Sequence, residues 1–298
     1  RTYLFYSGAN DPEWSHAAIG VAVSNDGRQF EKLKHINPVI DGRGDQFNSQ
    51  ESVTPVVVRM GSYYHMFFGA SAKDHPHARG IGAARADDPL GPWTTLGTIA
   101  KPEEHWEGSS IDLGPSEVKI DETEVLLYYS NVNIRMPSRI PFVSRSCRRS
   151  VGILKVKVLS AGSIEGLRYH GNPLKHLNGP SGSPSENLFC PGHFTLESMN
   201  YLVPGMCTYS VGFPFRQYIG LFSDGQPYFQ NAGKATVLID GPTMKNEILP
   251  RVVDELALDS PCPVVKEDCV HLYYSVMDRH DGLWKTALSL IEKDLFSS

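Results

Sequence analysis

Short runs of apolar and aromatic residues, separated by turn-forming residues, recur along the whole chain. One set of four runs returns at about 60 residues: a strand containing proline, an aromatic strand, a strand of small residues opened by glycine, and a short last strand. Four short strands per repeat are typical of a β-propeller blade. The clearest copy has its four strands at 55–58, 63–69, 80–85 and 92–96.

The other copies complete a set of five. They predict strands at 115–118, 125–130, 151–156 and 167–169; at 191–194, 201–209, 218–222 and 228–229; and at 263–265, 271–275 and 284–288. A partial copy at 3–8, 19–24 and 30–33 lacks its first, inner strand. We therefore expect an all-β, five-bladed β-propeller that uses residues 1–298 as a single domain. A β-sandwich has the same local pattern, but nothing in it requires the whole set of four to repeat. The one short helical pattern covers 249–256.

Composition and charge remove several classes of protein. The net charge of −5 argues against general nucleic-acid binding. No apolar run reaches the roughly 18 residues of a membrane span. Residues 1–6 resemble a strand rather than the apolar core of a signal peptide, which slightly favours a cytoplasmic location. Five cysteines without a C-x-x-C pair favour neither a zinc site nor a disulfide framework, and the oligomeric state stays open.

Several phrases carry a resemblance to a known group of enzymes. Residues 19–30 and 37–40 resemble the "IGxAxSxDGxxW…NPV" phrase of five-bladed propeller glycosidases, the superfamily of glycoside hydrolase families 43, 32 and 130. Residues 86–93 are similar to the "A-x-x-P-x-G-P-W" phrase of family 43, and 171–174 repeat the Asn-Pro phrase. These phrases mark turns and blade edges, so they indicate the scaffold better than the reaction. The resemblance also implies a structural Ca²⁺ on the axis and no organic cofactor.

Polar residues precede the recurring proline at similar distances in four copies. They stand three to five positions before Pro55, Pro115, Pro191 and Pro263, and they are Glu51, Asp112, Glu186, Asn187 and Asp259. Glycoside hydrolysis needs one carboxylate as base or nucleophile and one carboxylic acid as proton donor. The resemblance implies that such acids come from different blades, with Glu186 as general acid and Glu51 or Asp112 as base or modulator of the donor's pKa. An acid before a strand can also cap a turn or pair with an arginine.

Further residues are candidates for substrate binding. His65, His193 and Trp106 are expected near the same rim, where aromatic and imidazole groups contact sugars, and Asp259 and Asn187 join them. The segment 135–149 holds five arginines, including Arg149, and no acid, so it suits phosphate or is a solvated insertion. His75 and His77 make a weak metal motif, and a loop lining the sugar cleft is the better interpretation.

Together these features predict a glycoside hydrolase that acts on an oligo- or polysaccharide, with a furanoside among the candidates. Two alternatives stay open: a glycoside phosphorylase that binds phosphate through 135–149, and a catalytically silent carbohydrate-binding propeller. The silent form is favoured by one departure from the family pattern, the Asp expected directly before the proline. Other residues occupy these positions, namely Thr54, Gly114, Cys190 and Cys262.

Overall fold

A computed structural model describes residues 1–9, 16–42, 47–76, 78–132, 149–159, 163–208, 216–243, 258–277 and 284–296. Within these ranges the chain forms strands and short 3₁₀ helices, the latter at η1 (His105–Glu107), η3 (Lys175–Leu177), η4 (Pro184–Glu186) and η5 (Lys293–Phe296). None of the helices in this part of the chain is long and apolar enough to cross a membrane. The helical pattern at 249–256, and the arginine-rich segment apart from Arg149, lie outside the described residues.

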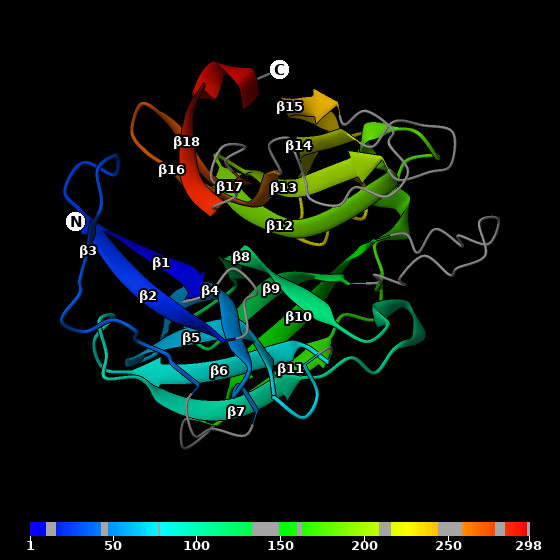
Figure 1. Cartoon of the computed structure of the whole chain (residues 1–298). Coiled ribbons are helices and arrows are strands. Elements are labelled where there is room, and N and C mark those ends of the chain that lie inside the picture. The colour runs from blue at the N-terminus through cyan, green and yellow to red at the C-terminus, as the bar shows by residue number, and fades with distance from the viewer. Residues whose placement is uncertain are drawn as a thin grey trace. The chain divides into compact units, whose positions relative to one another are not determined.

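The first sheet combines two groups of strands (Figure 1). One group is β1 (Thr2–Ala9), β2 (Ala17–Ser24) and β3 (Glu31–Lys32); the other is β4 (Glu51–Met60), β5 (Tyr63–Ser71), β6 (Gly80–Ala86) and β7 (Thr94–Ala100). Only the parallel pair Ala17–Glu51 joins β2 to β4, whereas β4 to β7 form a continuous antiparallel series. The two groups therefore match the partial copy and the clearest copy of the sequence repeat.

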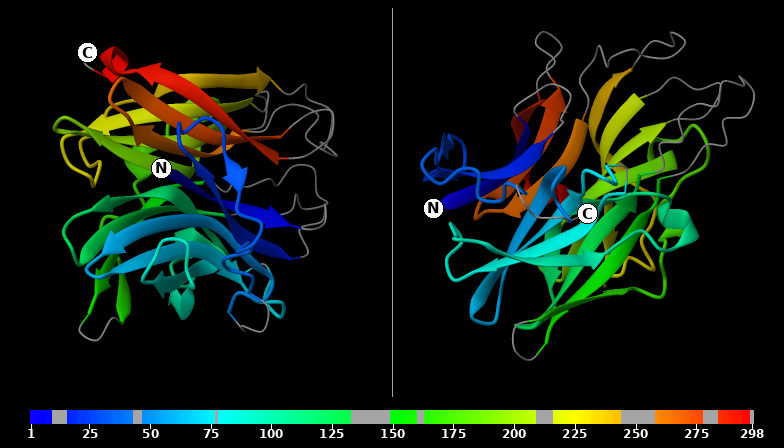
Figure 2. Two further views of the ribbon diagram at one scale, coloured as in Figure 1. Left: turned by 90° about the vertical axis from the view of Figure 1, so that its left-hand side faces the viewer. Right: turned by 60° about the horizontal axis from the view of Figure 1, so that its bottom comes forward.

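Three further sheets hold the other copies. They are β8 (Ile111–Lys119), β9 (Glu124–Asn131), β10 (Val151–Val158) and β11 (Ile164–Arg168); β12 (Asn187–Leu196), β13 (Met199–Thr208), β14 (Arg216–Asp224) and β15 (Thr236–Thr243); and β16 (Leu258–Val265), β17 (Cys269–Met277) and β18 (Trp284–Glu292). Figure 2 shows the last group, orange to red, side by side. Five groups of strands thus follow the five copies of the repeat. One predicted strand is wrong: residues 228–229 lie in a turn, and the last strand of the fourth group is β15, at Thr236–Thr243.

The chain divides into two compact units, each described here by itself. The first contains Arg1–Leu113, Lys119–Leu127 and Leu154–Arg168, and the second contains Gly114–Val118, Tyr128–Ile153 and Tyr169–Ser298. The expectation of one domain over residues 1–298 stays a prediction.

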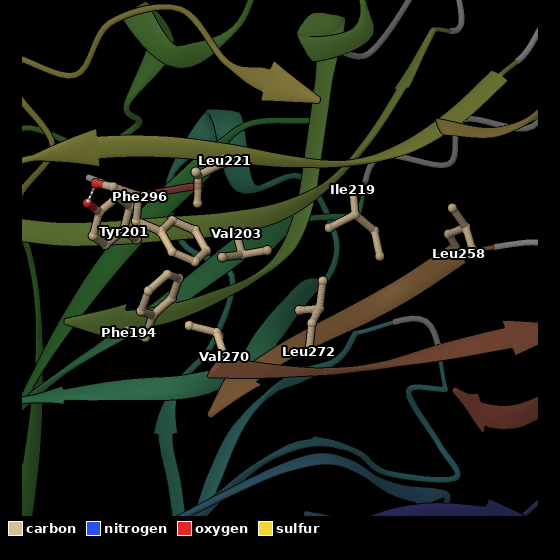
Figure 3. Close-up of a cluster of buried hydrophobic side chains, with 9 residues drawn as sticks. All are labelled: Phe194, Tyr201, Val203, Ile219, Leu221, Leu258, Val270, Leu272 and Phe296. Carbon is tan, nitrogen blue, oxygen red and sulfur yellow. Dashed lines mark hydrogen bonds between the residues drawn. The ribbon is translucent and has the colours of Figure 1, made fainter. Parts of the chain in front are cut away.

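An apolar cluster lies between the last two sheets of the second unit (Figure 3). Val203 and Ile219 come from β13 and β14, and Val270 and Leu272 from β17; all four side chains are at most 1% exposed. At one end the Tyr201 hydroxyl donates to the Phe296 carbonyl at 2.9 Å, which ties η5 to β13. Each buried aliphatic side chain contributes about 1.5–3 kcal/mol, so clusters of this kind hold neighbouring sheets together.

The Asn-Pro phrases have the same structural role in two copies. The Asn37 amide accepts from the Val21 N–H at 2.8 Å and donates to the Val21 carbonyl at 2.9 Å. The Asn172 amide makes the same pair of bonds with Ile153, at 2.8 and 2.9 Å. An amide side chain that bonds both main-chain groups of one residue replaces a neighbouring strand. This explains why the phrase recurs at the edge of a blade.

Candidate functional site

The first strand of three groups changes register at a residue that directly precedes proline. These residues, Thr54, Cys190 and Ser260, have φ angles of 50°, 41° and 50°. Each lies at the register shift of its strand, between Val53 and Val56, Phe189 and Gly192, or Asp259 and Cys262. A bulge accommodates a proline that cannot donate to the ladder, so these strands continue through it.

The bulge shows which proline of the last group is equivalent to Pro55, and it is not the one chosen from the sequence. The proline equivalent to Pro55 is Pro261, not Pro263, because Pro261 follows the residue with positive φ. Glu51 and Asn187 each stand three residues before the bulge, opposite Ser71 and Cys207. Asp259 stands one residue before it, so the expectation that Asp259 and Glu51 share a position is wrong.

In the first unit, Arg79 brings two of the predicted acids together. Its Nε and Nη2 donate to the two carboxylate oxygens of Glu51 at 2.7 and 3.0 Å, and its Nη1 donates to Asp112. Burial alone would lower the pKa of Arg79, but the charges of Asp112 and Glu51 outweigh it and raise this pKa. The side chains of Arg79, Glu51 and Asp112 are 26%, 12% and 11% exposed. The cluster is thus a charged triad that solvent, and hence a small ligand, can reach.

Three strand ends meet at this triad. Glu51 opens β4 and pairs with Ser71, whose hydroxyl donates to the Glu51 carboxylate at 3.1 Å. Arg79 directly precedes β6, and its main chain bonds the Ser110 hydroxyl at 3.2 Å and the Ile111 N–H at 3.0 Å. Arg79 follows the predicted loop of His75 and His77 closely, but no motif in the sequence links it to the acids. The available signal was its position before the small-residue strand, which begins at the same end of the sheet as β4.

In the second unit, Glu186 and Asn187 lie where η4 passes into β12. The Glu186 side chain is 0% exposed, and its carboxylate accepts from the Gly182 N–H at 3.0 Å. The Asn187 amide oxygen accepts from the Arg149 N–H at 2.9 Å. The Arg149 guanidinium in turn donates to the Asn131 carbonyl at 3.0 Å and the Ser130 hydroxyl at 3.2 Å. Arg149 therefore fixes the ends of β9 and β10 beside β12.

Three charged residues near the buried thiol of Cys207 affect its pKa. Burial is the main reason that the pKa of Cys207 rises to about 12; Arg149 opposes this rise, and Glu186 and Asp259 add to it. Asp259 accepts from the Ser260 N–H at 2.6 Å, which orients its carboxylate at the bulge of β16. The second unit thus gathers Glu186, Asp259 and Arg149 near Cys207, at the Asn187 end of β12.

His193 and His65 lie elsewhere. His193 pairs with Leu202, nearer the other end of β12, and its ring stacks on Tyr128 at 5.5 Å. Burial lowers the pKa of His193 to about 4. His65 pairs with Val58, at the opposite end of β4 from Glu51, and burial and Arg85 lower its pKa. The expectation that both histidines lie near the rim is wrong, because they pack against aromatic rings inside the sheets.

Trp106 lies in η1, shortly before β8. Its Nε1 donates to the Glu104 carboxylate at 2.9 Å. The neighbouring Glu107 is fully buried and pairs with Arg168 at 2.8 Å, which anchors the segment. Trp106 therefore precedes the strand end that carries Asp112, and its contact with substrate stays a prediction.

Comparison with known proteins identifies the scaffold. No protein-family profile matches the chain, and no curated protein matches it. Among solved structures, an exo-1,5-α-L-arabinanase from a bovine ruminal metagenomic library matches with a TM-score of 0.58 at 11% identity, over 97% of this chain and 88% of that one. A Bacillus subtilis arabinanase matches with a TM-score of 0.57 at 12% identity, over 99% and 91%. A family 117 glycoside hydrolase from Zobellia galactanivorans matches with a TM-score of 0.60 at 12% identity, over 96% and 78%.

These structures are five-bladed propellers, and the matches span nearly the whole chain. The chain has the five-bladed β-propeller fold. In propeller terms, β1 to β3 form the first blade, and the first strands of the other blades are β4, β8, β12 and β16. The predicted acids and amide therefore all lie at or beside the starting ends of first strands.

The axial Ca²⁺ implied by the propeller resemblance has no matching side-chain cage in the described ranges. No group of three or more His, Cys, Asp or Glu side chains in those ranges could hold a metal ion. Ca²⁺ takes 6–8 oxygen ligands. Because these ligands include main-chain carbonyls and waters, the axial Ca²⁺ stays a prediction, and no step of the proposed reaction uses a metal.

Proposed function

We propose that this propeller is a glycoside hydrolase acting on an oligo- or polysaccharide. The observation that carries the proposal is the Glu51–Arg79–Asp112 triad, in which two partly exposed carboxylates are fixed about one guanidinium at the starting ends of two first strands. Fixed carboxylates from separate blades are what glycoside hydrolysis requires. The likeness to arabinanases and a family 117 glycoside hydrolase supports the same reaction class.

Within this proposal the residues have different roles. Arg79 donates hydrogen bonds to the carboxylates of both Glu51 and Asp112. A carboxylate held in this way can act as a base, or as a negative charge that stabilises an oxocarbenium-like transition state. Arg79 is a positioning residue, because it acts by orienting the two carboxylates. Glu186 is the proposed general acid. Because its side chain is fully buried, proton donation requires the turn from Gly182 to Glu186 to open.

The substrate class is also a proposal. One structural match is an α-L-arabinanase from Cellvibrio cellulosa complexed with arabinohexaose, with a TM-score of 0.56 at 12% identity. Linear arabinan and aryl α-L-arabinofuranosides are therefore the first substrates to test, followed by xylan and galactan and the corresponding aryl glycosides.

The test measures kcat and KM for the protein and four variants. We expect Glu51→Gln, Asp112→Asn and Glu186→Gln each to lower kcat by about 10²–10⁴-fold, as for loss of a general acid or base. Arg79→Met is expected to lower kcat by at least about tenfold with a smaller change in KM, because it releases both carboxylates. Glu122→Gln is the matched control, since Glu122 is exposed and pairs with Lys119.

Two results contradict the proposal. One is absence of turnover on every substrate tested, which leaves a carbohydrate-binding propeller. The other is unchanged turnover in the three acid variants. Sugar phosphate that appears only when inorganic phosphate is supplied identifies a phosphorylase instead.

A further inference from the structure

The rings of His170 and Tyr228, in the second unit, pack around the ring of Tyr169. The Tyr169 ring lies 4.5 Å from the His170 ring and 4.9 Å from the Tyr228 ring, measured between centroids. The Gln230 amide donates to the Tyr169 hydroxyl. His170 and Gln230 are exposed, and the two tyrosines are half-buried. We call Tyr169, His170, Tyr228 and Gln230 together the aromatic shelf.

The shelf is built on fixed main chain. A Cβ at Gly171 would come within 2.5 Å of the Tyr169 ring, so only glycine leaves room for this ring to fold back over the backbone. On the other side, the Pro227 carbonyl accepts from the Tyr128 hydroxyl at 2.6 Å, and Phe229 is fully buried. Tyr228 is therefore held between two anchored neighbours. Fixed rings lose little conformational entropy when a ligand binds.

The shelf is separate from the candidate site. Tyr228 and Gln230 follow the end of β14 at Asp224, and Asp224 pairs with Asn200. Cys207, which lies near the candidate residues Glu186 and Asp259 of the second unit, pairs with Gln217 near the start of β14. The two places thus lie at opposite ends of the same sheet.

The chemistry of the shelf suits a neutral sugar chain. Aromatic faces pack against the C–H faces of sugar rings, and a phenol, an imidazole and an amide at their edges bond hydroxyl groups. The four side chains contain no carboxylate and no guanidinium. The shelf therefore lacks the paired hydrogen-bond donors with which a guanidinium binds phosphate or sulfate. Three packed rings offer a sugar chain a larger apolar surface than one ring does.

We propose that the aromatic shelf is a surface subsite that binds a neutral polysaccharide chain at the opposite end of its sheet from Asn187 and Cys207. The proposal rests on the proposed function only for its choice of ligand, the polysaccharide that the enzyme would cleave. When the shelf binds the same polysaccharide molecule as the active site, it raises the effective concentration of that polysaccharide near the active site. It leaves the turnover of small substrates unchanged.

The experiment is affinity electrophoresis in gels that contain linear arabinan, xylan or galactan, combined with turnover of aryl glycosides. We expect retention of the unmodified protein in at least one gel, and a loss of affinity of about tenfold in Tyr228→Ala and in Tyr169→Ala. Tyr63→Ala is the matched control, because Tyr63 is 37% exposed and lies in the first unit. His170→Ala and Gln230→Ala replace exposed residues, so they test the shelf with little risk to folding, which thermal melts verify.

The outcomes separate the two proposals. The shelf is contradicted if no polysaccharide retains the unmodified protein, if folded shelf variants bind as tightly as it does, or if Tyr63→Ala weakens binding equally. Loss of retention together with unchanged aryl glycoside turnover supports both proposals. Loss of retention in a protein without any turnover supports the shelf and contradicts the hydrolase.

Discussion

Glu117, in β8, makes the stability of the protein depend on pH. Its side chain keeps some exposed surface, but burial of the carboxyl raises its pKa from 4.5 to about 7. The folded protein therefore holds a proton between these pH values that the unfolded chain releases, and its stability falls as the pH rises from about 4.5 to 7. We expect Glu117→Gln to remove this fall and to stabilise the protein at pH 8 by about 2 kcal/mol, a value reduced for the partial exposure.

Urea unfolding at pH 4.5, 6 and 8 measures the effect of Glu117. The difference between the two proteins should be near zero at pH 4.5 and largest at pH 8. His193 changes stability in the opposite direction, because its pKa of about 4 means that stability is lost as the pH falls from 6.5 to 4. This contribution is common to both proteins and cancels in the difference. A difference that is the same at all three pH values would contradict the assignment to Glu117.

Residue positions were only partly predictable from the sequence. Counting from proline located Glu51 and Asn187 correctly, because the bulge keeps one spacing in those two strands. It failed for Asp259, because residues 260–263 contain two prolines and only the backbone distinguishes them. Arg79 was missed because an ion pair between segments 28 and 33 residues apart leaves no local pattern.

Among the elements, the Asn-Pro phrase is the most specific link between sequence and fold. The Asn172 amide bonds both main-chain groups of Ile153 and donates to the Tyr129 hydroxyl at 3.2 Å. We expect Asn172→Ala to destabilise the protein by about 1–3 kcal/mol, since it leaves the Ile153 N–H without its acceptor, whereas the Ile153 carbonyl still accepts from the Tyr169 N–H at 3.0 Å. Asn172→Asp keeps the acceptor for the Ile153 N–H and should cost less.

The test of the Asn-Pro phrase compares equivalent and unrelated asparagines. Asn37→Ala removes the same pair of bonds in the first blade and should have a similar cost. Asn25→Ala, at an exposed position, is the control. Equal melting temperatures for Asn172→Ala and Asn25→Ala would show that the amide does not replace a strand.

Most strands were predictable, but the last strand of the fourth group, β15, and the starts of the first strands were not. The prediction placed the first strand of the clearest copy at 55–58, whereas β4 runs from Glu51 to Met60. Proline usually interrupts a ladder, so sequence reasoning starts the strand at Pro55. Here the bulge at Thr54 lets the strand continue through it, which places Glu51 inside the strand. Glu51 is thus held by paired main chain, a firmer support for a catalytic group than a loop.

At the scale of the whole molecule, the repeat predicted the five-bladed propeller because each copy specifies three or four strands of one blade. The division of the chain into two compact units was not predictable from that repeat. Glu51 and Asp112 belong to the first unit, and Glu186 and Asp259 to the second. The unit boundary depends on which sheets pack most closely, which the period of the repeat does not encode.

The same boundary leads to a prediction about unfolding. It passes through three strands, β8, β9 and β10, each of which belongs partly to both units. A strand cannot lose half of its ladder without weakening the rest, so we expect one cooperative transition and not two. Calorimetry tests this by comparing the calorimetric and van't Hoff enthalpies, and far- and near-ultraviolet circular dichroism should give coincident midpoints. Two separated transitions would show that the units unfold independently and would contradict the expectation of a single domain.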